Sequence, residues 1–175
     1  MLRDFINIIG VNDVSEFPVL TALDRYNQFT VEENLEIPAE KPDVEQITSV
    51  MIEAKVTDFR AIATPTGLKV IINGIVNQKV VYTALEPTQS IHSAYFTKGF
   101  CTFIEIPLTI APGTNTMTIL QSLGITLDDV VDGEPQVIIE DLSVKLVDTR
   151  NVKKCGVLFV WVTVNAVLAP FFPVA

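Results

Sequence analysis

The sequence predicts an all-β protein, an antiparallel β-sandwich of the jelly-roll or immunoglobulin-like type. Three observations support this class. Runs rich in β-branched and aromatic residues recur along the chain, bounded by Gly, Pro, Asn and Asp. Several runs alternate between apolar and polar residues, as strands with one buried face do. Helical patterning is scarce, and only residues 116–131 suggest a short helical turn.

The first clear strands lie between residues 46 and 85. Residues 46–58 alternate between apolar and polar side chains, and a turn at residues 65–67 leads into a second run over residues 68–85. The inward side chains of this second run are predicted to be Val70, Ile72, Gly74, Val76, Val80 and Tyr82. The Asn73-Gly74 pair within it predicts a bulge or a tight bend.

The later strands follow the same reasoning. Residues 90–96 and 100–108 are predicted as two strands that separate near Gly99. Residues 137–147 show the clearest period of two, and after a turn the run over residues 157–167 returns. These last two segments predict an antiparallel hairpin.

Two apolar segments flank this core and divide the chain into an N-terminal arm (1–35), a β domain (36–167) and an apolar C-terminal tail (168–175). Apolar residues make up 49% of the chain and charged residues only 19%, which indicates buried surface beyond an ordinary core. Either the arms exchange between subunits or they fold back onto their own domain. The candidate subunit-interface residues are Phe5, Ile6, Ile8, Ile9, Phe17, Leu20, Leu168, Phe171 and Phe172.

Charge and hydropathy exclude several partner classes. The net charge of -9 disfavours binding to nucleic acid or to an anionic membrane surface. Residues 156–175 carry no charge over the length of a membrane span, yet their β-branched residues and Pro170 and Pro173 predict a strand followed by a tail. The N-terminus lacks a signal-peptide pattern, so synthesis in the cytoplasm is expected.

The residues that carry most enzyme chemistry are sparse, and no catalytic, cofactor or metal site is predicted. His92 is the single histidine, and with Cys101 and Cys155 it shows no zinc-ligand spacing. The chain has no phosphate-binding glycine loop and no nucleophile elbow. An acidic loop at residues 128–134 offers oxygens for Ca²⁺ but lacks the EF-hand pattern, and such runs are typical of solvated loops.

The two cysteines are predicted to be core or edge thiols in a reducing compartment. If the finished structure lies outside the cell, Cys101 and Cys155 could instead join neighbouring copies as an intersubunit disulfide.

A motif at the start of the predicted domain resembles a known family. Residues 37–50 read I-P-A-E-K-P-D-V-E-Q-I-T-S-V, which resembles the opening of the SPOCS domain, found in sporulation proteins of clostridia and their relatives. Gly74 with Lys79 and Tyr82, the F-x-x-F-I-E-I-P segment at residues 100–107 and the two closing strands agree in order. The resemblance covers about residues 35–165.

The resemblance implies a β-rich, non-enzymatic module of spore envelope proteins, made in the mother cell. Better-known members join several such modules to a peptidoglycan-binding LysM domain, and this chain shows one module and no LysM domain. The expected function is therefore a self-assembling structural protein of a spore envelope layer or appendage, whose partners are further copies of itself. Two alternatives stay open: an adaptor that docks another coat protein, and a carbohydrate-binding sandwich, for which Trp161 and three tyrosines offer few stacking platforms.

The shared motif also has a structural interpretation. The prolines after Ile37 and Lys41 favour an extended entry into the first strand, because a residue before proline avoids the helical region. Asp43, Glu45 and Gln46 are then expected to bond backbone groups near that strand.

Overall fold

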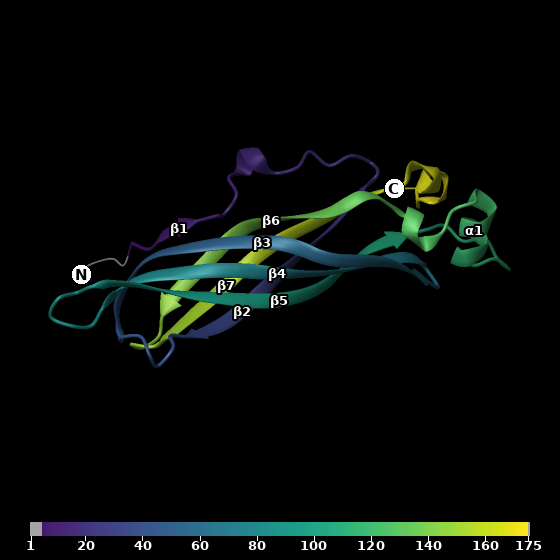
Figure 1. Ribbon diagram of the computed structural model, residues 1–175. Coiled ribbons are helices and arrows are strands. Elements are labelled where there is room, and N and C mark those ends of the chain that lie inside the picture. Colours follow the sequence, from purple (N-terminus) through teal and green to yellow (C-terminus); the bar gives the residue numbers. More distant parts are fainter. Residues whose placement is uncertain (1–4, 175) are drawn as a thin grey trace.

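Two β-sheets that face each other along an elongated body form the computed structural model, which describes residues 5–174 (Figure 1). The first sheet has the order β1 (Asn7–Ile9), β3 (Val44–Thr64), β4 (Gly67–Ala84), β5 (Ile91–Pro107). The second has the order β2 (Asp24–Glu36), β7 (Asn151–Val164), β6 (Val131–Leu146). The mostly-β class is thus confirmed, whereas the jelly-roll or immunoglobulin-like type stays a prediction. Residues 1–4 of the predicted arm and 175 of the tail lie outside the described residues.

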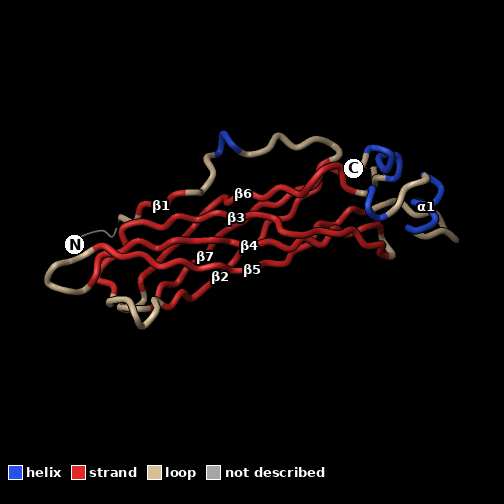
Figure 2. Tube along the Cα trace, viewed as in Figure 1, coloured by secondary structure: helices blue, strands red, loops and turns tan. Residues whose placement is uncertain are grey.

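Helices occupy the end of the body where the last residues lie. They are α1 (Thr116–Leu123), η2 (Leu127–Asp129) and η3 (Ala166–Phe171), whereas η1 (Val14–Glu16) stands apart on the N-terminal segment (Figure 2). Asn115 caps α1 by accepting a hydrogen bond from the Thr118 amide at 2.9 Å, and Gly124 ends the helix in the left-handed conformation. The short helix expected within residues 116–131 is therefore present.

The core lies between the sheets and follows the period of two in β4. All six inward side chains predicted for this strand are buried, and five of them have an exposed fraction of 0%. Strand β7 contributes the facing row from the other sheet, including Leu158, Val160 and Val162. Because β4 and β7 each have a neighbouring strand on both sides, these rows form the interior of the protein.

Two local predictions about glycines are corrected by the structure. The bulge expected at Asn73-Gly74 lies instead on the neighbouring strand β3. The register of β3 shifts between Val56 and Asp58, the residues that pair with Gly74 and Asn73. The expected break near Gly99 is absent, because β5 runs without interruption past this residue. Gly74 is required for packing: an added Cβ would lie 2.2 Å from Cζ of Phe100 and 2.6 Å from the Lys55 carbonyl oxygen.

The N-terminal segment, residues 5–23, joins the two sheets. Here the prediction of a wholly antiparallel architecture is wrong. β1 pairs with β3 in parallel, so the first sheet is mixed. The segment then crosses to the second sheet, where the Asn12 amide donates to the Ile139 carbonyl at 2.9 Å and the Asn12 Oδ1 accepts from the Ile139 amide at 3.0 Å. The two bonds satisfy the backbone amide and carbonyl of Ile139 in β6. They lie next to the point where the pairing of β6 with β7 shifts register, between Ile139 and Asp141.

Residues 24–35, which the sequence placed in the N-terminal arm, belong to β2 and pair with β7 along the whole strand. The same pairing places Glu33 opposite Lys154 inside the core. Lys154 is 1% exposed, and its Nζ lies 2.7 Å from Oε2 of Glu33. Gln78 of β4 donates from Nε2 to the same oxygen at 2.6 Å, so a buried polar group spans both sheets. Nothing in the sequence pattern identified these three residues as partners.

Replacement of Gly74 by alanine tests the packing of Phe100 over β4. Because the new methyl group would overlap both a ring and a backbone oxygen, we expect Gly74→Ala to lower the free energy of unfolding by about 1–3 kcal/mol. Gly99→Ala is the matched control, since its nearest non-neighbouring atom lies 4.0 Å away, and it should change stability by no more than about 0.5 kcal/mol. Urea denaturation of both variants measures the difference, and equal stability would contradict the packing argument.

Candidate functional site

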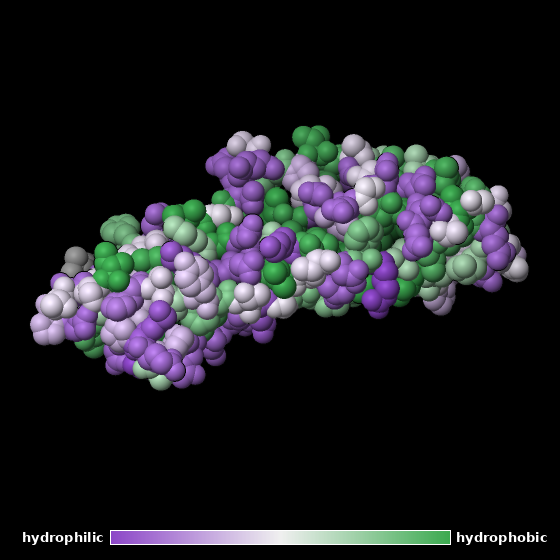
Figure 3. Space-filling view, in the orientation of Figure 1, coloured by the Kyte–Doolittle hydropathy of each residue, from purple (hydrophilic) through white to green (hydrophobic). Residues whose placement is uncertain are grey.

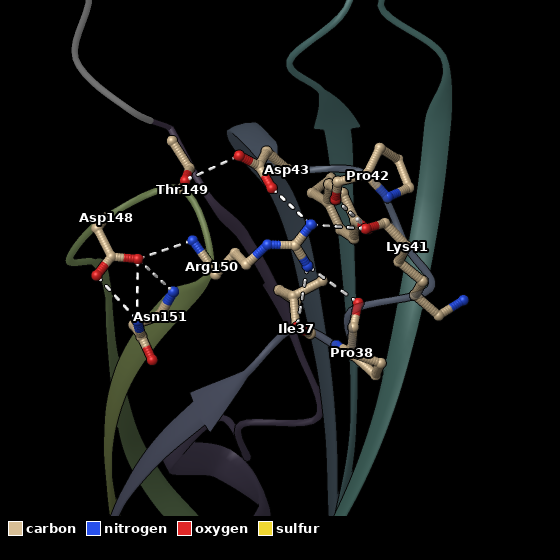
Figure 4. A network of polar contacts seen from close by, with 10 residues as sticks. Ile37, Pro38, Lys41, Pro42, Asp43, Asp148, Thr149, Arg150 and Asn151 are labelled. Carbon is tan, nitrogen blue, oxygen red and sulfur yellow. Dashed lines mark hydrogen bonds and ion pairs between the residues drawn. The ribbon is translucent and has the colours of Figure 1, made fainter.

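The motif shared with the SPOCS opening wraps around a single guanidinium group, that of Arg150 (Figure 4). Arg150 lies in the turn between β6 and β7. Its Nη1 donates to the carbonyls of Ile37 at 3.4 Å and Pro38 at 3.1 Å, and its Nη2 donates to the carbonyl of Lys41 at 3.1 Å. Nη2 also forms an ion pair with Oδ1 of Asp43 at 2.7 Å. One side chain therefore binds both prolyl corners of the motif.

Backbone bonds fix the same turn against the motif. The Ile37 amide donates to the Arg150 carbonyl at 2.8 Å, and the Val44 amide donates to the Thr149 carbonyl at 2.7 Å. Asp148 accepts from the Arg150 and Asn151 amides, both at 2.8 Å. These hydrogen bonds hold the pKa of the Asp148 carboxyl below its usual value, the Arg150 amide contributing most. The turn is thus held by hydrogen bonds that do not involve the Arg150 side chain.

Tyr82, a buried residue of β4, also contacts this network. Its ring is fully buried, and its hydroxyl donates to the Pro42 carbonyl at 3.1 Å. Burial raises the pKa of Tyr82 above its ordinary value of 10.0, with Arg150 opposing the rise and Asp43 adding to it. A neutral hydroxyl is what this hydrogen bond requires, because only the protonated phenol donates.

The prediction that the side chains of Asp43, Glu45 and Gln46 bond nearby backbone groups is wrong. Asp43 binds the side chains of Arg150 and Thr149 instead. Glu45 accepts from the Gln89 side chain at 2.8 Å, while the backbone carbonyl of Gln46 accepts from Thr83. The sequence missed Arg150 because it lies about a hundred residues from the motif and carries no local signal.

The N-terminal segment carries several highly exposed apolar side chains, and the assignment of a subunit interface to it stays a prediction. Phe5 is 81% exposed, and among the predicted interface residues Ile9 and Leu20 are also exposed. Ile6, Ile8 and Phe17 are half-buried. Two further residues that the prediction did not include are highly exposed, Val14 at 77% and Val19 at 94%. Figure 3 shows hydrophobic surface along this segment, interrupted by the hydrophilic η1.

The three predicted interface residues of the C-terminal tail pack on their own domain, whereas Val174 is 98% exposed. Leu168 is fully buried, and Phe171 and Phe172 are half-buried against the core at the helical end. The Thr109 amide donates to the Phe171 carbonyl at 2.7 Å, and the Arg25 guanidinium lies 4.3 Å from the centre of the Phe172 ring. The predicted interface residues in the tail therefore present less free surface than those of the N-terminal segment.

An open cavity of about 380 Å³ lies on the outer face of the first sheet. It crosses all four strands of that sheet, because Ile9, Met51, Lys79 and Tyr95 occupy one paired row. Met51 and Tyr95 are exposed there, and the Lys79 ammonium lies 5.1 Å from the centre of the Tyr95 ring. The groove is mainly apolar, and the charged side chains in its lining are Lys79 and Glu53.

His92 contacts Ser90, but the acid, histidine and serine do not form the hydrogen-bond chain of a hydrolytic triad. The His92 Nε2 lies 3.0 Å from Oγ of Ser90, and the Glu86 carboxylate contacts this same hydroxyl. A triad needs its acid on the second imidazole nitrogen, where it fixes the tautomer. Among the hydrogen bonds of residues 5–174 Glu86 reaches the serine and not the imidazole. His92 also stacks on Tyr82, with ring centres 5.9 Å apart.

Cys101 and Cys155 lie on the outer faces of different sheets. Cys101 alternates with the buried Phe100 and Thr102 in β5, and Cys155 alternates with the buried Lys154 and Gly156 in β7. Facing sheets lie roughly 10 Å apart, so two outward cysteines are beyond the reach of a disulfide within one chain. A bond between copies stays a prediction.

The acidic loop uses one of its carboxylates in a helix cap. Oδ2 of Asp129 accepts from both the amide and the hydroxyl of Thr126 at 2.8 Å. Among the described residues no group of three His, Cys, Asp or Glu side chains is arranged to hold a metal ion. Nor does any helix within residues 5–174 have the length and hydropathy needed to cross a membrane.

Trp161, the possible carbohydrate platform, lies on the outer face of the second sheet in an aromatic row. Its ring centre is 5.8 Å from that of Phe159, which in turn stacks on Tyr26 at 5.0 Å. Tyr26 is exposed, whereas Phe159 is buried beneath its neighbours. The row thus presents one exposed ring, that of Tyr26, which is 53% exposed.

Comparison with known proteins places the chain in a family. A family model described as the SipL, SPOCS domain matches residues 43–147. Searches of curated proteins and of solved structures gave no match. The match confirms the resemblance to this family over a narrower range than the predicted 35–165. It begins at Asp43, within the motif at residues 37–50, and ends just before the turn that carries Arg150.

Arg150→Ala tests whether this guanidinium holds the motif in place. The substitution removes an ion pair and three hydrogen bonds, and a hydrogen bond to a charged group contributes about 1.5–3 kcal/mol. We expect unfolding free energy to fall by about 2 kcal/mol or more. The control is Arg60→Ala, an exposed arginine on β3, which should change stability little. Equal effects of the two substitutions in urea denaturation would contradict the assignment.

Tyr82→Phe tests the buried hydroxyl and its pH dependence. Loss of the bond to Pro42 should cost about 1 kcal/mol at neutral pH. Because the folded pKa of Tyr82 is raised above 10.0, its contribution is complete below the unfolded pKa and is lost as pH rises through the folded pKa. Wild-type stability should therefore fall above pH 10, and the decline should be shallower in the variant. Urea titrations between neutral and strongly alkaline pH check this, and parallel curves would contradict it.

Proposed function

Because the chain belongs to the family of the SipL, SPOCS domain, we propose that it is a non-enzymatic structural protein of a spore envelope layer or appendage, and that it assembles with further copies of itself. The family membership carries the association with sporulation. The self-assembly rests on the exposed apolar side chains of the N-terminal segment. A surface of this kind is unfavourable in water unless another molecule covers it.

The position of these side chains favours an open-ended assembly. The N-terminal segment is held by a three-residue strand and by one exchange of hydrogen bonds at Asn12. It leaves Phe5, Val14 and Val19 outside the core. A contact between this segment and a different surface of the next copy is heterologous, and such contacts give rings or filaments. An exposed Cys101 could then strengthen neighbouring contacts if the layer is oxidised.

The second candidate is an adaptor that docks one different coat protein. The observation that favours it is the apolar groove over Met51 and Tyr95, because a groove of this kind suits an apolar side chain of a partner. An adaptor would remain a monomer or dimer alone and would form a stoichiometric complex. Size-exclusion chromatography with light scattering separates the two candidates.

Val19→Asp tests assembly through the N-terminal segment. Val19 is 94% exposed, so a charge there should leave the fold intact while opposing the burial of this surface between copies. We expect large assemblies of the wild-type protein in negative-stain micrographs and monomers of the variant at the same concentration. Val147→Asp is the control, an exposed valine outside the segment, and should assemble as the wild type does. A monodisperse wild-type monomer at high concentration would refute self-assembly.

A further inference from the structure

Three polar side chains meet in the middle of the apolar core without any role in the surfaces described above. Lys154 belongs to β7, Glu33 to β2 and Gln78 to β4, so the group spans both sheets. Lys154 is 1% exposed and Gln78 is 3% exposed. The inward neighbours of the three residues on their own strands are Val31, Leu35, Val76, Val80, Val152 and Gly156.

The arrangement places a nucleophile, an acyl group and a proton-transfer group in contact. The Lys154 Nζ donates a hydrogen bond to Oε1 of Gln78, the oxygen bonded to the carbon that the amine would attack. Oε2 of Glu33 lies 2.7 Å from this Nζ and accepts from Nε2 of Gln78 at 2.6 Å. A single carboxylate oxygen therefore touches both the attacking nitrogen and the nitrogen that would leave. Such contacts meet the distance requirement for general acid–base catalysis.

We propose that Lys154 and Gln78 form an intramolecular isopeptide bond in the folded protein, with Glu33 as the catalytic residue. Glu33 takes a proton from the Lys154 ammonium, and the neutral Nζ attacks Cδ of Gln78. The carboxyl group of Glu33 then gives its proton to Nε2, the Cδ–Nε2 bond breaks, and ammonia leaves. The remaining proton of the amine is lost with it, so that one ammonium ion is released and Glu33 ends as a carboxylate. No oxidant, reductant or cofactor is consumed.

The apolar surroundings favour this reaction over its competitors. Fixed contact between the reacting groups replaces a bimolecular encounter, which in well-oriented systems raises rates by many orders of magnitude. Exclusion of water suppresses hydrolysis of the amide and of the tetrahedral intermediate. Glu33 retains some solvent contact, with its side chain 11% exposed, which gives ammonia an exit between β2 and the surface.

The bond would join the central strands of the two sheets. β4 is an inner strand of the first sheet and β7 is the middle strand of the second, so a covalent link between them prevents the sheets from separating. A closed loop of this kind also restricts the unfolded chain, as a disulfide does. Unlike a disulfide, it is insensitive to reducing agents.

Intact-mass spectrometry of the full-length wild-type protein tests the proposal directly. The bond removes one ammonia, so the mass should be about 17 Da below that calculated from the sequence. Tryptic digestion should yield residues 70–79 joined to residues 154–175 through Gln78 and Lys154. Lys154→Met and Glu33→Gln should show the full mass of their sequences. Lys153→Met, which removes the neighbouring lysine on the outer face, should keep the deficit and give residues 70–79 joined to residues 151–175, because trypsin then cleaves after Arg150.

The wild-type measurement decides the question even if a core variant fails to fold. A wild-type protein of full mass, with the two peptides recovered separately, would overturn the proposal. A deficit of about 17 Da that maps to an asparagine, as succinimide formation gives, would overturn it as well. A joined peptide that persists in Glu33→Gln would refute the role of Glu33 alone.

Discussion

The burial of one face of β4 against one face of β7 is the constraint on which the rest of this structure depends. Both strands are inner strands of their sheets, and their inward positions alternate strictly along most of their length. A shift of one residue in either strand would turn a full row of Val, Ile and Leu to solvent. The register of β3, β5, β2 and β6 follows, because each pairs with one of these two strands. The buried Lys154, Glu33 and Gln78 then fix the same register through polar contacts, since breaking such a buried pair costs about 3–5 kcal/mol.

The two ends of the body are closed by different means. At one end Arg150 draws the motif at Ile37–Asp43 onto the β6–β7 turn by an ion pair and carbonyl contacts. At the other end α1, η2 and η3 cover the second half of the core, with Leu120 and Leu168 buried beneath them. The Arg150 end is polar because the carbonyls of Ile37, Pro38 and Lys41 lie between β2 and β3, outside the strand pairing. A guanidinium with five donors satisfies several of them at once. In this protein the contacts with Arg150 therefore hold the segment that enters β3 in place.

Most apolar side chains of this protein lie in the core, but some remain on the surface. Most of the long hydrophobic side chains fill the two core clusters, and the C-terminal tail joins them through Leu168. The N-terminal segment differs, because it contributes only partly buried side chains to the core and leaves Phe5, Val14 and Val19 exposed. The outer groove over Met51 and Tyr95 adds a second apolar surface on a different face. The two apolar surfaces lie on different parts of the molecule, the N-terminal segment and the outer face of the first sheet.

The sequence by itself determined the mostly-β class, the inward row of β4, the β6–β7 hairpin and the SPOCS family. Each of these depends on local alternation or on a contiguous motif, which the chain carries regardless of its surroundings. It did not reveal that residues 24–35 pair with β7, that β1 runs parallel to β3, or that β5 continues through Gly99. Those features follow from which strand lies beside which, and strand pairing between distant segments leaves no mark on either one. The same holds for Arg150 and for Lys154, Glu33 and Gln78: only the tertiary structure brings these charged and amide groups together, because their contacts join residues far apart in the chain.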